Sequence, residues 1–188
     1  MVSAILLAAG LSSRMGGDKL LLPYRGKPML QHALDVLAAL PAEEKIVVTT
    51  QARLGEVGIP GGIRAVINPH PEDGLSGSVR LGVLSATGGW YLFMTADQPL
   101  LGLTDIQPIL DGAADSEIGI VHPVIGGSPC MPSLFSARFR AKLLSLTGDM
   151  GGRAVRDAHP GACLGITPTN PGNFLDIDSL EDYLSLDG

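Results

Sequence analysis

The sequence is poor in aromatic residues, in charged residues and in cysteine. Aromatic side chains make up 4% of the 188 residues and charged side chains 17%, whereas hydrophobic residues make up 45%. These proportions are typical of a globular protein and exclude a disordered chain. The two cysteines, Cys130 and Cys163, lie far apart and form no Cys-x-x-Cys pair. This excludes a disulfide scaffold and predicts a reduced, cytoplasmic protein.

Long apolar runs are also missing. No run approaches the roughly 20 residues that a membrane-spanning helix needs, so we expect no membrane association. The first apolar run, residues 2–9, lacks the basic flank and the cleavage site of a secretory signal. No segment repeats at a fixed period, which excludes a solenoid. A chain of 188 residues without such features predicts one domain over residues 1–188.

Two common catalytic patterns are absent as well. The sequence contains no Gly-x-Ser-x-Gly, so a hydrolase with its nucleophile on that turn is not predicted. None of the four histidines has the short spacing found in zinc sites. We interpret each as structural or exposed: His32, His70, His122 and His159.

The basic residues are unevenly distributed. The net charge of −6 argues against nucleic-acid binding. Residues 14–27 have a net charge of +3, which comes from four basic side chains and one acidic side chain: Arg14, Lys19, Arg25, Lys27 and Asp18. The rest of the chain carries −9. A small positive segment in an acidic protein favours a small polyanion as ligand, although an ordinary basic surface loop would have the same composition.

The basic segment overlaps a glycine-rich loop that follows directly on an apolar strand. Residues 2–9 are predicted to form a buried strand, which Gly10 ends. The loop from Gly10 to Lys19 presents backbone N–H groups with little side-chain bulk, and such loops hold phosphate. Neither GxxxxGK[ST] nor GxGxxG fits, because Asp18 separates Gly17 from Lys19 and the glycine spacing is wrong. The alternative is a tight turn that only connects two elements.

Apolar periodicity predicts alternating helices and strands along the rest of the chain. Helical spacing is present at residues 27–40, 51–57, 75–84, 103–114, 136–146 and 180–186. Further strands are predicted at residues 45–50, 63–67, 90–96, 117–123 and 162–166. Alternation with short connections predicts an α/β fold with a mostly parallel sheet and helices on both faces.

Polar residues stand at the ends of two of these elements. Asp97 follows an apolar strand, at the carboxyl end where open α/β sheets bind ligands, although an Asx-turn before Pro99 would also explain it. Ser76 and Ser78 lie at the start of a predicted helix, where free backbone donors favour an anion. A plain N-cap is the alternative for either serine.

Several stretches together resemble one family. Residues 7–30 read LAAGLSSRMGGDKLLLPYRGKPML and are similar to the N-terminal signature of nucleotidyltransferases that build nucleoside-diphosphate products. Later motifs of the same enzymes are matched at residues 68–82, 96–99, 148–153 and 176–178. The chain most closely resembles the molybdenum cofactor cytidylyltransferases of the MobA-like NTP transferase family. This resemblance implies a three-layer Rossmann-like fold of the nucleotide-diphospho-sugar transferase type.

The resemblance also implies roles for individual residues. It makes Arg14, Lys19 and Asp97 the catalytic residues, with the two cations on the phosphates of a nucleoside triphosphate. The implied nucleotide-binding residues are Leu7, Ala8, Ala9, Gly10, Ser12, Arg14, Lys19, Asn68 and Ser78. The implied cofactor is Mg²⁺, held by Asp97 and Asp176, with Asp178 as the other candidate for the second ligand. Asp149 and Arg153 are implied to bind the acceptor.

The reaction implied by the resemblance is transfer of a nucleoside monophosphate from a nucleoside triphosphate to a phosphorylated small molecule, with release of pyrophosphate. Ala8-Ala9-Gly10 looks like the cytidylyl form of the motif, because guanylyl relatives carry Ala-Gly-Gly. CTP is therefore the expected substrate. The implied acceptor is the molybdopterin cofactor, and a molybdoenzyme is an implied maturation partner.

One segment departs from the family pattern. Close relatives carry Arg-Gly-His-Pro before a Leu-Phe strand, whereas this chain has Pro129, Cys130, Met131 and Pro132. The missing Arg and His belong to the part of the family that faces the acceptor, so the identity of the acceptor stays open. Two alternatives follow. One is a nucleotidyltransferase of the same fold that uses another phosphorylated small molecule, and the other is a nucleotide-binding module without catalysis.

Overall fold

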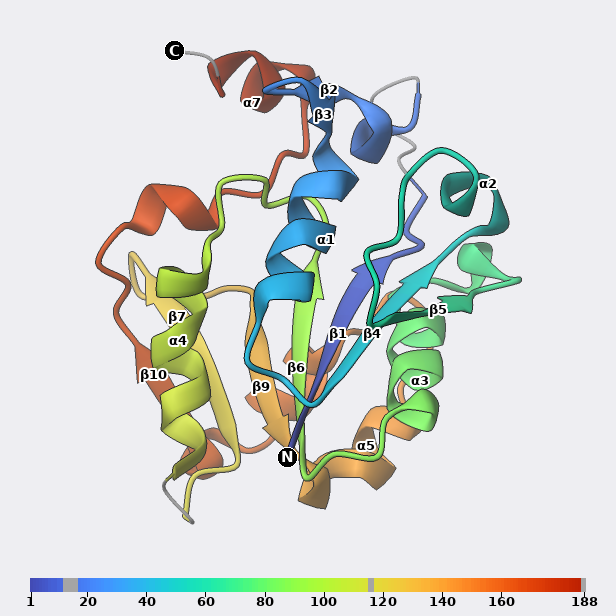
Figure 1. The fold of residues 1–188 in the computed structure, drawn as a ribbon. Helices are drawn as coiled ribbons and strands as arrows, with labels where there is room; N and C mark the ends of the chain where they lie inside the picture. Colours follow the sequence, from blue (N-terminus) through green and yellow to red (C-terminus); the bar gives the residue numbers. More distant parts are fainter. Residues whose placement is uncertain (12–16, 115–116, 187–188) are drawn as a thin grey trace.

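In the computed structural model, which describes residues 1–11, 17–114 and 117–186, helices pack on both faces of a central sheet (Figure 1). The strands of this sheet are β1 (Val2–Ala8), β4 (Glu44–Thr49), β5 (Ile63–Ile67), β6 (Trp90–Thr95), β7 (Ile120–Ile125), β8 (Ser128–Pro129), β9 (Ser133–Ser136) and β10 (Cys163–Ile166). A separate hairpin consists of β2 (Pro23–Tyr24) and β3 (Lys27–Pro28). The α-helices are α1 (Met29–Ala39), α2 (Gln51–Leu54), α3 (Leu75–Ser85), α4 (Leu103–Asp111), α5 (Arg140–Leu144), α6 (Gly152–Asp157) and α7 (Leu180–Ser185).

The sheet is mostly parallel, as the sequence predicts. Its strands follow the order β10-β7-β9-β6-β1-β4-β5, and β8 pairs with β7. β1 lies in the middle and is parallel to β4 and to β6. β9 is antiparallel to both of its neighbours, β6 and β7. Because β1, β4 and β6 run in the same direction, the residues that follow them gather at one edge of the sheet.

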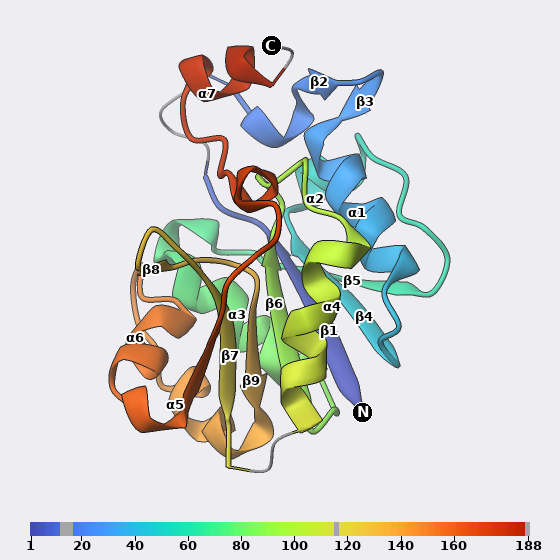
Figure 2. The same cartoon turned by 90° about the vertical axis from the view of Figure 1, so that its left-hand side faces the viewer.

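Alternate residues of β1 enter two separate cores. Leu6 and Ala8 belong to a core that α1 and α4 complete, and Ile5 and Leu7 belong to a core that α3 and α5 complete. Figures 1 and 2 show these two pairs of helices on opposite faces of the sheet. A strand that is buried on both faces has to be apolar at nearly every position, which is why residues 2–9 form a continuous apolar run.

The predicted helices and strands are present, and the main difference is a helix that was not predicted. No helix is predicted between residues 146 and 180, but α6 begins at Gly152. A Cβ atom at Gly152 would lie 2.8 Å from the Phe135 ring, so the missing side chain lets α6 pack directly on β9. The helix predicted at 136–146 begins with a 3-10 turn before α5. No helix in the described ranges has the length and apolar character needed to cross a membrane.

Two of the matched motifs come into contact at Gly74. This residue has φ +87°, and a Cβ atom there would lie 2.5 Å from Oδ1 of Asp149. Next to it, the N–H of Ser76 donates to the carbonyl of Gly148 at 3.1 Å. Only glycine permits this approach, so Gly74 brings the start of α3 against the turn that carries Asp149.

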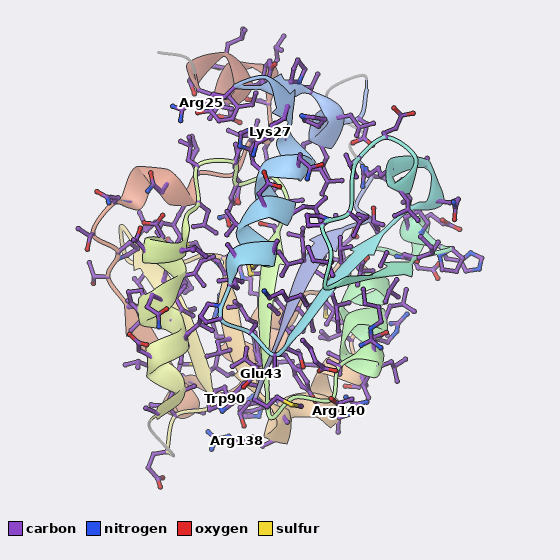
Figure 3. All side chains as sticks on the ribbon, viewed as in Figure 1. Arg25, Lys27, Glu43, Trp90, Arg138 and Arg140 are labelled. Atoms are coloured by element: carbon purple, nitrogen blue, oxygen red, sulfur yellow. The ribbon has the colours of Figure 1, made fainter. Side chains whose placement is uncertain are left out.

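The basic segment is divided in the structure. Lys27 pairs with Asp35 on α1, and Arg25 lies over the ring of Tyr24 with its Cζ 5.0 Å from the ring centroid. Figure 3 shows Arg25 and Lys27 near the β2–β3 hairpin, at the opposite end of the molecule from Glu43. Neither basic side chain lines the cavities described below. The local charge of +3 therefore overstates the number of cations that a bound anion would meet.

Candidate functional site

Two adjoining cavities lie where β1 and β6 end. The loop cavity has a volume of about 520 Å³, and its wall includes Leu7, Gly10, Lys19, Ser78, Asp97 and Asp149. The α6 cavity has a volume of about 580 Å³, and its wall includes Phe93, Cys130, Met131, Phe135, Arg153, Arg156 and Asp176. Both cavities are lined by Leu7, Leu75, Thr95 and Asp149. They are therefore two compartments of one site.

A cation and a carboxylate that the sequence singled out meet in the loop cavity. Nζ of Lys19 lies 2.9 Å from Oδ2 of Asp97, and it also donates to Oδ1 of Asp178 and to the carbonyl of Ile177, each at 2.9 Å. Lys19 begins a short 3-10 turn that the side chain of Asp18 caps. Burial alone would lower the pKa of Lys19, but the charge of Asp97 and hydrogen bonds to Asp178 and Asp97 raise it. Lys19 therefore stays cationic at neutral pH.

The Asx-turn proposed as an alternative for Asp97 is absent from the described structure. Oδ2 of Asp97 accepts from Lys19, and Oδ1 is buried without a hydrogen-bond partner among the described residues. A buried anionic oxygen without a partner is unfavourable and would be stabilised by a cation. The position of Asp97 thus fits a metal ligand better than a turn former.

Asp176 adds to the negative charge near Asp97. Burial of the carboxyl group raises the pKa of Asp176 to about 6, and the charges of Asp97 and Asp178 add to this rise, although the residue as a whole is exposed to solvent. Within the described ranges, no group of three or more His, Cys, Asp or Glu side chains is arranged to hold a metal ion. Magnesium is often held by one or two carboxylates together with substrate phosphates, so Asp97 and Asp176 remain suitable ligands.

Ser179 caps the final helix, α7. Its hydroxyl accepts from the N–H of Asp182, and the carboxylate of Asp182 accepts in return from the N–H of Ser179 at 2.8 Å. This capping box leaves the side chain of Asp178 free to contact Lys19.

The N-cap alternative for the serines of α3 is wrong. Gly74 occupies the cap position, where no side chain forms a capping hydrogen bond, and both Ser76 and Ser78 lie inside the helix. Ser78 is 3% exposed, and its hydroxyl accepts from Nδ2 of Asn68 at 3.1 Å. Ser78 lines the loop cavity, whereas Asn68 holds it from behind. Asn68 therefore acts on the cavity through Ser78.

The residues at the end of β1 do not all face the loop cavity. Leu7 and Gly10 line it, whereas Ala8 and Ala9 are each 1% exposed and belong to the two cores. The methyl group of Ala9 thus packs into the core shared with α3, and any effect of Ala9 on the base would be indirect. Ser12 and Arg14 lie outside the described residues.

The α6 cavity is lined by both predicted acceptor residues and by one arginine that was not predicted. Asp149 lies in the turn before α6, and Arg153 lies on α6 with an exposed side chain that pairs with Asp157. Arg156, one turn further on, is only 9% exposed and donates to Oδ1 of Asp157 from Nε at 3.0 Å and Nη2 at 2.9 Å. The i,i+3 spacing of the two arginines could have indicated a shared face, had the helix been predicted.

Cys130 lines the α6 cavity as an uncharged thiol. Burial raises its pKa to about 11, and the charge of Asp176 contributes in the same direction. The thiol is therefore protonated at neutral pH and is a poor nucleophile. Cys130 contributes shape and polarity to this wall, together with Met131 and Phe135.

Several known proteins are similar to this chain over most of its length. The model of the family described as MobA-like NTP transferase domain matches residues 4–163. A probable molybdenum cofactor guanylyltransferase of Rhodopirellula baltica is 33% identical over 69% of this chain and 70% of its own length. A nicotine blue oxidoreductase of Paenarthrobacter nicotinovorans is 27% identical over 98% of this chain and 96% of its own. The solved structure of a nucleotidyl transferase from Methanothermobacter thermautotroptrophicus matches with a TM-score of 0.81 and 25% identity, over 99% of this chain and 95% of that one.

Proposed function

This chain belongs to the MobA-like NTP transferase family and is a nucleotidyltransferase, and from this premise we propose that it transfers CMP from CTP to the phosphate of the molybdopterin cofactor. Pyrophosphate is the second product. The proposal includes Mg²⁺ as cofactor and a molybdoenzyme as the protein that receives the finished cofactor.

The observation that carries the proposal is the 2.9 Å contact between Lys19 and Asp97 in the wall of the loop cavity. One residue supplies a cation for phosphate and the other supplies a carboxylate for a metal. They come from the segments that follow β1 and β6, which are neighbours in the sheet. A triphosphate in the loop cavity would therefore meet both groups at once, with the acceptor in the adjoining α6 cavity.

The residues present fit a divalent metal. The unpaired Oδ1 of Asp97 and the crowded carboxyl of Asp176 are the two groups that would hold it. When bound, Mg²⁺ neutralises charge on the phosphates and on the leaving pyrophosphate. Lys19 would then exchange its contact with Asp97 for phosphate oxygens, and its raised pKa keeps it cationic for that role.

Positioning and charge neutralisation are sufficient for this chemistry. An oxygen of the acceptor phosphate attacks the α-phosphorus of the nucleotide, and pyrophosphate leaves on the opposite side. The attacking phosphate is ionised at neutral pH, so the site needs no general base. The protein's contribution is to hold the two substrates in line across the shared wall of the cavities.

The identity of the nucleotide base is tested by a direct comparison of triphosphates. We expect faster pyrophosphate release with CTP than with GTP, ATP or UTP when molybdopterin is the acceptor. The Ala8-Ala9-Gly10 form of the motif supports CTP, whereas the relative from Rhodopirellula baltica carries a guanylyltransferase name. Faster release with GTP would overturn the assignment of the base and leave the reaction class intact.

A different phosphorylated acceptor is the second candidate, and the segment from Pro129 to Pro132 favours it. Cys130 and Met131 line the α6 cavity where close relatives carry a different motif. Pyrophosphate release with a phosphosugar or a phosphoalcohol, and none with molybdopterin, would identify this case. Because one full-length relative is named as an oxidoreductase, pyrophosphate itself is the product to measure.

A further inference from the structure

A buried arginine lies beneath the loop cavity and matches none of the motifs used above. Arg53 belongs to the four-residue helix α2, yet only 4% of it is exposed. Its Nη1 donates to the carbonyl of Ala8 at 2.7 Å, and its Nη2 donates to the carbonyl of Gly10 at 2.8 Å. Its Nε and Nη2 also donate to the carboxylate of Asp18, the latter at 2.9 Å.

These contacts join the two ends of the glycine-rich loop. Ala8 ends β1 and Gly10 follows it, whereas Asp18 stands at the other end, directly before Lys19. Oδ1 of Asp18 also accepts from the N–H of Leu20 at 3.1 Å and so caps the turn that carries Lys19. The guanidinium of Arg53 thus connects the end of the central strand to the turn that places the cation of the cavity.

The ion pair between Arg53 and Asp18 also compensates a negative charge that would oppose triphosphate binding. A carboxylate next to Lys19 would repel a triphosphate, because it lies beside the cavity that has to receive several negative charges. Arg53 places a positive charge against both oxygens of Asp18. Lysine could not make these contacts, because only the planar guanidinium donates in several fixed directions at once.

We propose that Arg53 is a positioning residue for triphosphate binding. It fixes the ends of the loop and compensates the charge of Asp18, so that Lys19 is in place before the nucleotide arrives. This inference rests on the proposed function, since it assumes that the loop cavity binds a triphosphate. Arg53 itself lines neither cavity and acts through Asp18 and Lys19.

The test measures binding of CTP and of inorganic tripolyphosphate by calorimetry, which needs no acceptor and no turnover. The variants are Arg53→Met, Arg53→Lys, Asp18→Asn and the double variant Arg53→Met with Asp18→Asn. Arg64→Met is the control, because Arg64 is an exposed residue of β5 whose side chain pairs with Glu44 of β4. Asparagine at position 18 keeps an oxygen that can still accept from the N–H of Leu20.

We expect Arg53→Met to bind both probes roughly tenfold more weakly than wild type, since it leaves Asp18 without its guanidinium. The affinity of Arg53→Lys should lie between those of wild type and Arg53→Met. Arg64→Met should bind both probes within about twofold of wild type. The decisive result is recovery of affinity. The double variant Arg53→Met with Asp18→Asn should bind both probes several-fold more tightly than Arg53→Met alone. A merely structural role would lower the melting temperature without such recovery.

Two results would overturn the inference. The first is that Arg53→Met and Arg53→Lys both bind tripolyphosphate as tightly as wild type. The second is that the double variant binds no better than Arg53→Met. If wild type binds neither probe, the proposed function itself fails, and this outcome is distinct from the other two. If Arg53→Met does not fold, the binding of tripolyphosphate by Arg53→Lys is compared with that of wild type.

Discussion

The loop cavity and the α6 cavity share a wall but are built in different ways. In the loop cavity, Lys19 makes three hydrogen bonds of 2.9 Å, and nearby the buried Arg53 forms an ion pair with the partly exposed Asp18. In the α6 cavity, the walls are mainly apolar, and the charged groups belong to α6 and the turn before it, except for Asp176. The first compartment is thus polar and held by charged contacts, as the proposed triphosphate site requires, whereas the second offers mainly apolar walls to its ligand.

This contrast explains why the sequence motifs indicate the nucleotide end of the site more clearly than the acceptor end. Phosphates are the same in every nucleoside triphosphate, so the loop that meets them keeps a recognisable pattern. The segment at 129–132, by contrast, departs from the pattern of the family that the chain resembles. Assignments made from the motifs are therefore stronger for the loop cavity than for the α6 cavity.

The largest effect is expected at Asp97. Asp97→Asn should lower kcat by about 10²–10³, comparable with the loss of one group that stabilises developing charge. The affinity for nucleotide without metal should change little. Pyrophosphate release and calorimetry measure the two quantities, and Asp111→Asn, on the exposed end of α4, is the control. Activity within about tenfold of wild type would remove Asp97 from the catalytic machinery.

A smaller and selective effect is expected at Arg156. Arg156→Met should raise KM for the acceptor by roughly tenfold, because it removes the buried cation from the α6 cavity while leaving the loop cavity unchanged. KM for the nucleotide should stay the same. Arg153→Ala should have less effect, since that side chain is 82% exposed. Equal increases in both KM values would show that the compartments are not independent.

The smallest effect is a dependence of stability on pH. The folded pKa of Asp176 is raised to about 6, above its ordinary value, so its ionised form opposes folding above pH 6. Asp176→Asn should therefore raise the melting temperature at pH 8, by only about 2 °C because solvent screens the exposed side chain, and the gain should disappear as the pH falls from 6 to 4.

Asp157→Asn is the opposite case. Hydrogen bonds from Arg156 lower the pKa of Asp157, so its ionised form stabilises the fold near neutral pH. That variant should melt at a lower temperature at pH 8, and the difference should vanish in acid. The same sign of change for both variants at pH 8 would contradict this account. Thermal melts between pH 4 and pH 8 provide the measurement.

Local patterns predicted the sheet and its helices, and the family resemblance implied that Lys19 and Asp97 serve the same nucleotide. The apolar run of β1 and the strand before Asp97 are visible in the sequence because parallel strands are buried on both faces. Parallel neighbours then bring their carboxyl ends together without any knowledge of side-chain contacts.

The remaining features depend on contacts between distant segments. Arg53 reads as an ordinary residue of a short surface helix, and its burial becomes evident only when α2 is placed beneath the loop. α6 was missed for a similar reason, because Gly152 reads as a helix breaker until the ring of Phe135 is found against it. The antiparallel course of β9 likewise follows from its pairing with β6 and β7.

The shared wall of the two cavities has a consequence for inhibition. Leu7, Leu75, Thr95 and Asp149 border both compartments, so a single molecule can occupy them together. The product of the proposed reaction is such a molecule, and it should dissociate more slowly than either substrate, because each half holds the other at high effective concentration. Departure of product would then limit the turnover rate, and a stable bisubstrate analogue would be a far tighter ligand than a nucleotide alone.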